Sequence, residues 1–89
     1  SKFCLVENSI TPKNVNLDLC LTQALNSLKA YLEETKATIH RRPLPVIKGD
    51  AASLTLLFQN LIANAVKFQK DSLPEIFVTL EEEAEDYVI

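Results

Sequence analysis

The stretch from Asp50 to Gln69, "DAASLTLLFQNLIANAVKFQ", decides the interpretation of this 89-residue sequence. Its apolar residues recur every three or four positions, the spacing of an amphipathic helix, and Asp50 is a favoured N-cap residue. The sequence therefore predicts a helix from Ala51 to about Gln69. The residues expected on its apolar face are Leu54, Leu57, Phe58, Leu61, Ile62, Ala65 and Phe68.

Two asparagines and a lysine interrupt this apolar helix. Asparagine is a mediocre helix former, because its side chain competes for backbone hydrogen bonds. At about 100° per residue, Asn60, Asn64 and Lys67 fall within about 60° of one another, along the border of the apolar face. Carboxamide oxygens can face Mg²⁺, a lysine can contact phosphate, and Phe68 offers a flat face to a ring. Asparagines that simply bond water would explain the same spacing, so both interpretations stay open here.

The composition limits the class of protein. A chain of 89 residues with 47% hydrophobic and 24% charged residues fits one small globular domain with a modest core. The net charge of −3 gives no reason to expect nucleic acid, and no apolar run reaches membrane-spanning length. Cys4 and Cys20 lack a metal-binding spacing and are interpreted as small apolar residues in a reducing compartment, with a disulfide as the alternative. The single glycine excludes a glycine-rich phosphate loop within this chain.

The first half of the chain contains a second helical pattern. Apolar residues from Leu17 onward keep a helical spacing, so we expect one helix that Asn16 or Asp18 caps and that ends by Lys36. "PLPVIKGD", residues 43–50, is expected to be an extended linker, because a proline disfavours helix in the residue before it.

Strand patterns occupy the rest of the chain. "ATIHRR" (residues 37–42) and "EIFVTLEEE" (75–83) predict strands, the second with Ile76, Val78 and Leu80 on one side. "DYVI", residues 86–89, predicts another. The order helix, strand, helix, strand, strand indicates an α+β fold, in which two helices cover one face of a sheet.

The segment "LPVIKGDAASLTLLFQNLIANAVKFQ", residues 44–69, resembles the N-box region of the ATP-binding domain of sensor histidine kinases. That family has an aspartate-started helix followed by N-L-x-x-N-A-x-K-[FY]. The matching residues here are Asp50, Asn60, Leu61, Asn64, Ala65, Lys67 and Phe68. Phytochrome-like kinases share the pattern LFQNLI.NA.KF. The resemblance covers about residues 10–89; its N-box match is specific, and its flanks are supportive.

The resemblance implies a fold, cofactors and roles for residues. The fold would be a two-layer α/β sandwich, part of the Bergerat (histidine kinase-like ATPase) fold. ATP and Mg²⁺ would be the cofactors. Asn64 would bind Mg²⁺, Asn60 would face the phosphates and a metal-bound water, Lys67 would contact phosphate, and Phe68 would pack beside the adenine. The parent protein would use ATP to phosphorylate a histidine of its own dimerisation domain and would then act on a response regulator.

The sequence departs from the family at two points. Many members carry Gln or Glu where this chain has Leu56, one turn before Asn60. The aspartate-and-glycine box, the lid and the second glycine box of the family are absent from these 89 residues. His40 is expected to be a solvent-edge strand residue and not a phosphate acceptor. A degenerate, non-catalytic kinase-like interaction module is therefore the alternative, whereas gyrase-type ATPases generally have Glu in place of Asn60.

The resemblance also suggests how the chain is organised. Residues 1–14 would be a linker or strand from a preceding dimerisation domain, and residues 15–89 the first part of a cytoplasmic kinase domain, soluble or membrane-attached in the parent. No catalytic residue is expected within this fragment, which should be inactive alone. An open sheet edge at Tyr87–Ile89 could pair two copies in a non-native homodimer.

Overall fold

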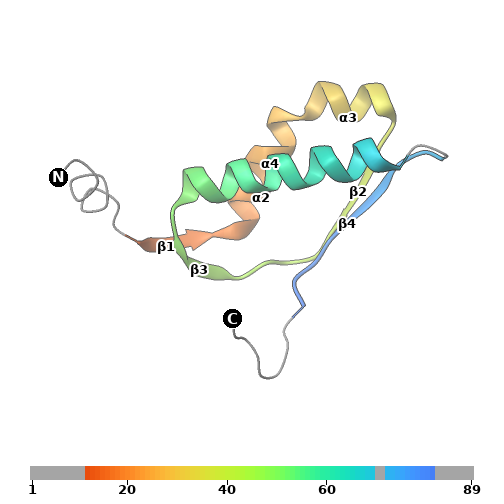
Figure 1. Ribbon diagram of the computed structural model, residues 1–89. Coiled ribbons are helices and arrows are strands. Elements are labelled where there is room, and N and C mark those ends of the chain that lie inside the picture. Colours follow the sequence, from red (N-terminus) through yellow and green to blue (C-terminus); the bar gives the residue numbers. More distant parts are fainter. Residues whose placement is uncertain (1–11, 70–71, 82–89) are drawn as a thin grey trace.

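The structure is a computed structural model that describes residues 12–69 and 72–81. Its elements in chain order are β1 (Lys13–Asn16), α2 (Leu17–Ser27), α3 (Lys29–Thr35), β2 (Thr38–Arg41), β3 (Val46–Gly49), α4 (Ala51–Phe68) and β4 (Glu75–Val78). The helices lie on one side and the strands run beneath them (Figure 1). The α+β expectation is confirmed. Cys4 and the strand expected at residues 86–89 fall outside the described residues.

The strands of the described region form two pairs instead of one sheet. β1 pairs antiparallel with β3, with Lys13 opposite Gly49, and β2 pairs parallel with β4, with Thr38 opposite Glu75. The prediction of an extended linker is therefore wrong at Val46–Gly49, which is a strand. Its partner lies thirty or more residues away in the sequence, so no local pattern could indicate the pairing.

The helix expected from Leu17 to Lys36 begins as predicted but is interrupted. The Asn16 side chain caps α2 and accepts hydrogen bonds from the backbone N–H groups of Asp18 and Leu19. Leu28 (φ −97°, ψ 8°) separates α2 from α3, and Lys36 ends α3 in the left-handed conformation. In a straight helix Leu21 and Leu32 would lie about 16 Å apart along the axis. The break allows both side chains to reach the same cluster.

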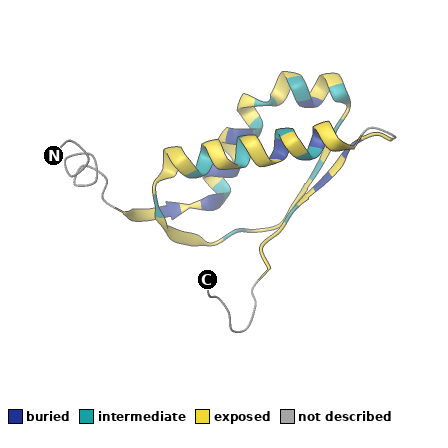
Figure 2. Cartoon of the chain, in the orientation of Figure 1, coloured by how far each residue is buried: buried dark blue, intermediate teal, exposed yellow. Residues whose placement is uncertain are grey.

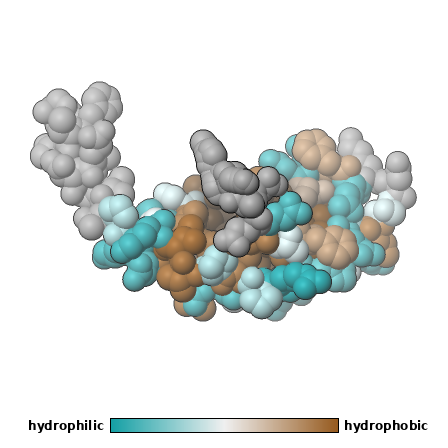
Figure 3. Space-filling model, turned by 90° about the horizontal axis from the view of Figure 1, so that it is seen from below, coloured by the Kyte–Doolittle hydropathy of each residue, from teal (hydrophilic) through white to brown (hydrophobic). Residues whose placement is uncertain are grey.

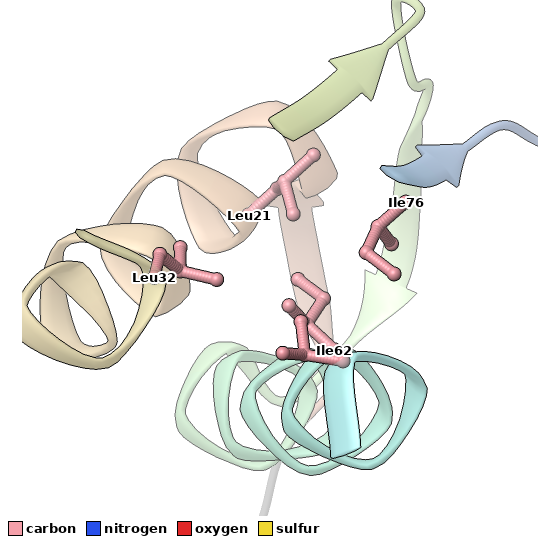
Figure 4. Packing of buried hydrophobic residues seen from close by; sticks show 5 residues of the cluster. Leu21, Leu32, Ile62 and Ile76 are labelled. Atoms are coloured by element: carbon pink, nitrogen blue, oxygen red, sulfur yellow. The ribbon is translucent and has the colours of Figure 1, made fainter. Parts of the chain in front are cut away.

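This cluster is the main core and joins both layers. Its buried members are Leu21, Leu32, Ile62, Val66 and Ile76. Figure 4 shows the labelled side chains Leu21, Leu32, Ile62 and Ile76 pointing toward one another from α2, α3, α4 and β4. Figure 2 shows that only one side of each helix is buried. Ile62 and Val66 are each 3% exposed, so they set the inward face of α4.

The sequence predicted the wrong side of α4 to face the core. Leu57, Leu61 and Phe68 were expected inside, yet they are 50%, 56% and 73% exposed, and Val66, which was not expected there, is buried. α2 packs against the side of α4 that carries Ile62 and Val66. Leucine, isoleucine, valine and alanine occur on most sides of this helix, so the pattern alone could not fix which side faces the core.

β4 follows the predicted alternation. Ile76 is buried and Val78 is half-buried, whereas Phe77 is 66% exposed on the opposite face. Leu80, which was expected beside Ile76, lies beyond the end of the strand and is 55% exposed.

The Thr55 hydroxyl is a buried, unsatisfied polar group. Its hydroxyl oxygen is buried and has no hydrogen-bond partner among residues 12–69 and 72–81. Because an unsatisfied buried hydroxyl is destabilising, we expect Thr55→Val to raise the free energy of unfolding by about 1 kcal/mol. Urea unfolding of both proteins measures this difference. A loss of stability in Thr55→Val would show that the hydroxyl has a partner in solution.

Candidate functional site

The sequence-predicted site residues lie together on the outward side of α4. Asn60, Asn64 and Lys67, hereafter the Asn–Lys stripe, are all exposed, and they lie opposite the buried Ile62 and Val66. The stripe had been expected at the border of the core. The structure instead centres it on the solvent-facing side, because α4 is rotated toward Val66.

The spacing of the stripe makes its side chains neighbours. Residues three and four apart on a helix are adjacent on its surface, so Asn64 is next to both Asn60 and Lys67. With a rise of 1.5 Å per residue, the stripe extends about 10 Å along the axis. That length suits a chain of phosphates with a bound cation. The two carboxamides offer oxygen ligands, and Lys67 is the only charged residue between Ala51 and Phe68.

Phe68 extends the site by one turn beyond Asn64. Its ring is 73% exposed, more than any other large hydrophobic side chain of the described residues. Leu56 lies one turn before Asn60 and is 56% exposed, so the stripe ends at an apolar side chain there. Phe68 is thus available to contact a ring, while the position of Leu56 offers no polar group.

The stripe is an open wall in this part of the chain. Hollows of about 550, 420 and 290 Å³ border the described residues, and none of the three is lined by Asn60, Asn64, Lys67 or Phe68. A ligand on the stripe would therefore keep much of its surface in water.

The start of α4 is fixed by its N-cap. The Asp50 carboxylate accepts hydrogen bonds from the Ser53 hydroxyl at 2.8 Å and from the Ser53 backbone N–H at 2.9 Å. These bonds, first the hydroxyl and then the N–H, favour the charged form and lower the pKa of Asp50. The cap fixes the helix that carries the stripe, although it lies more than two turns away from Asn60.

This lowered pKa predicts a pH dependence of stability. A carboxyl whose pKa is lower in the folded state stabilises above its unfolded value, here near 3.8, and loses that contribution as the pH falls through the folded pKa. We expect Asp50→Asn, which keeps a capping side chain, to flatten the acid limb of the stability profile. Urea unfolding from neutral pH into the acid range measures it. Equal slopes for both proteins would contradict the role of Asp50.

Two arrangements escaped sequence reasoning. His40 stacks on Phe77, with ring centroids 4.5 Å apart, and its Nε2 lies 3.3 Å from a carboxylate oxygen of Glu75. The Gln69 side chain bonds both the N–H and the carbonyl of Glu75. Both depend on how β4 is placed beside β2 and α4, and nothing local in the sequence signals it. His40 is an exposed strand residue, as expected.

The described residues contain neither a cluster of metal-binding side chains nor a membrane-spanning helix. Residues 12–69 and 72–81 contain no group of three His, Cys, Asp or Glu side chains that could hold a metal. Cys20 is buried, and its Sγ lies 3.7 Å from the Ala51 carbonyl oxygen. No helix in this part of the chain has the length and apolarity to cross a membrane.

Comparison with known proteins shows which proteins this chain is similar to. The chain matches no protein-family model. It is 40% identical over 65 residues to cyanobacterial phytochrome A of Nostoc sp., a match that covers 73% of this chain and 8% of that protein. It is 43% identical over 54 residues to the phytochrome-like protein Cph1 of Synechocystis sp., covering 61% of this chain and 7% of the relative. The chain thus spans less than a tenth of the length of these curated relatives, and over these short segments it is similar to phytochromes.

Proposed function

We propose that this chain forms one wall of the Mg²⁺–ATP site of a sensor histidine kinase. The observation that carries the proposal is the shared outward face of Asn60, Asn64 and Lys67 on α4, with Phe68 one turn beyond. The similarity to phytochrome proteins supports the same assignment. Residues 57–68 also resemble the pattern of phytochrome-like kinases.

The residues present fit such a ligand. Mg²⁺ prefers oxygen ligands and keeps several waters, so an exposed carboxamide oxygen of Asn64 can take one coordination position, with Asn60 bonding a metal-bound water. Lys67 contributes a positive charge to the phosphates. Bound Mg²⁺ would neutralise charge on the transferred phosphoryl group. The chain's own role is to hold and orient the nucleotide while a histidine of the dimerisation and phosphoacceptor domain is phosphorylated for transfer to a response regulator.

Leu56 favours a second candidate. A leucine stands where many kinases of this family have Gln or Glu, and its side chain is 56% exposed beside Asn60. A degenerate domain that binds a protein partner through this face would tolerate the change. Binding of nucleotide at the stripe distinguishes the two functions.

Nucleotide binding by the 89-residue chain tests the proposal. We expect ATP with Mn²⁺ in place of Mg²⁺ to broaden the amide NMR signals of Asn60, Asn64 and Lys67 first, because the paramagnetic ion would sit on Asn64. The dissociation constant should be near millimolar, about −4 kcal/mol, because the stripe is an open wall. Lys67→Ala should weaken binding by about 1 kcal/mol, the value of an exposed and screened ion pair.

The control is Leu19→Ala, which removes an exposed side chain of α2 and lies outside α4. It should leave the broadening unchanged. Broadening that centres on acidic residues such as Glu81, or none at all with ATP in excess, would contradict the proposed site.

A further inference from the structure

The end of α4 lacks the cap that commonly closes a helix. Phe68 is its last residue, and Gln69 follows with φ −97° and ψ 86°, outside the left-handed conformation typical of such caps. One backbone bond closes this end, from the Gln69 N–H to the Val66 carbonyl oxygen at 3.2 Å. The last turn of α4 therefore depends on further contacts for its position.

The Gln69 side chain provides these contacts. Its Nε2 donates to the Glu75 carbonyl oxygen at 3.0 Å, and its Oε1 accepts from the Glu75 N–H, also at 3.0 Å. One carboxamide thus bonds both backbone groups of a residue six positions further along the chain, an arrangement hereafter called the Gln69 clasp. The clasp ties the end of α4 to the start of β4, which lie at the same end of the molecule (Figure 1).

Glu75 is a well-fixed partner for the clasp. On the other edge of β4, the Pro74 carbonyl oxygen accepts from the Thr38 N–H of β2 at 2.9 Å. Ile76, next to Glu75, is buried in the core. The Glu75 side chain lies on the outward face, and its carboxylate pairs with His40. On this strand side of the molecule, hydrophilic and hydrophobic side chains are intermixed on the surface (Figure 3). Strand pairing and the core thus fix the backbone that the clasp bonds.

Only two residues lie between the core and the clasp. Val66 is buried, Gln69 is clasped, and Lys67 and Phe68 stand between them with exposed side chains. These are the residues to which the proposed function assigns the phosphates and the adenine. Since both side chains face solvent, the position of their backbone is set by Val66 on one side and by the clasp on the other.

We infer that Gln69 is a positioning residue of the nucleotide site, which holds Lys67 and Phe68 in place for the phosphates and the adenine. The inference rests on the proposed function. Without the clasp, the last turn of α4 would fray, as helix ends with unsatisfied carbonyl groups do. ATP would then have to order both side chains as it binds, which lowers its affinity. Asn60 and Asn64 lie further inside α4 and keep their positions.

Gln69→Met in the 89-residue chain tests this inference, because methionine has a similar length and can form neither bond. Exchange of the Glu75 amide, measured by NMR, reports on the clasp itself. We expect the amide to be protected about tenfold in the unmodified chain and unprotected in Gln69→Met. The dissociation constant of ATP with Mn²⁺, from an NMR titration, should rise about fivefold in Gln69→Met. Circular dichroism at the same temperature should show both proteins fully folded, so the weaker binding is not a loss of structure.

Gln23→Met is the matched control, since it makes the same change at an exposed position of α2. It should leave both the Glu75 exchange rate and ATP binding unchanged. A free-peptide exchange rate for the Glu75 amide in the unmodified chain would overturn the inference alone, even where ATP binds. Equal ATP affinities of the unmodified chain and Gln69→Met would do the same. No ATP binding by the unmodified chain would overturn the proposed function and this inference with it.

Discussion

Replacing Ile62 by alanine should lower the free energy of unfolding by about 3 kcal/mol, a loss large enough to unfold much of so small a protein. Ile62 is 3% exposed at the centre of the core, where it packs among side chains of α2, α3 and β4. Truncation there removes buried apolar surface and leaves a cavity that the surrounding helices cannot fully close. Urea unfolding followed by circular dichroism measures the change.

Leu57→Ala is the matched control for this prediction. Both residues belong to the apolar face expected from the sequence, but Leu57 is 50% exposed in the structure. Its truncation should change the free energy of unfolding by only about 0.5 kcal/mol, as is usual for exposed positions. Equal losses in the two variants would mean that α4 is rotated differently from the structure.

Asn64→Ala should reduce Mg²⁺-dependent autophosphorylation at least about a hundredfold in a longer protein that carries this chain together with its phosphoacceptor domain. This expectation rests on the proposed function. Asn64 is the central member of the stripe, so its carboxamide is next to both Asn60 and Lys67. Without that oxygen, the metal would lose the ligand that fixes the phosphates relative to the attacking histidine. Transfer of labelled phosphate from ATP measures the effect.

Two controls separate chemistry from folding in that experiment. Asn64 is exposed, so circular dichroism and the unfolding transition should be nearly unchanged in Asn64→Ala. Asn26→Ala removes an exposed asparagine from α2 and should retain full activity. Normal activity of Asn64→Ala would remove this residue from metal binding. It would favour the degenerate interaction module.

Local sequence patterns were sufficient to predict the main helix, α4, and the strand β4. Asp50 followed by a helical period predicted α4, and the alternation around Ile76 predicted β4 with its buried side. Asn16 was one of the two caps expected for α2, with Asp18 as the alternative. Each signal is local, because a cap bonds within three residues and a strand alternates within two. The same local spacing showed that Asn60, Asn64 and Lys67 share one face, without any knowledge of what the face contacts.

Tertiary structure decided the rest. The pairing of Lys13–Asn16 with Val46–Gly49 joins segments that no local pattern connects, so β3 was mistaken for a linker. The break at Leu28 reflects a packing requirement, because it brings α3 onto the same core as α2. Local sequence also could not determine which side of α4 faces the core. A helix that is apolar on most sides can bury several faces, and only the positions of α2 and β4 select Ile62 and Val66. That selection turns the Asn–Lys stripe outward to solvent.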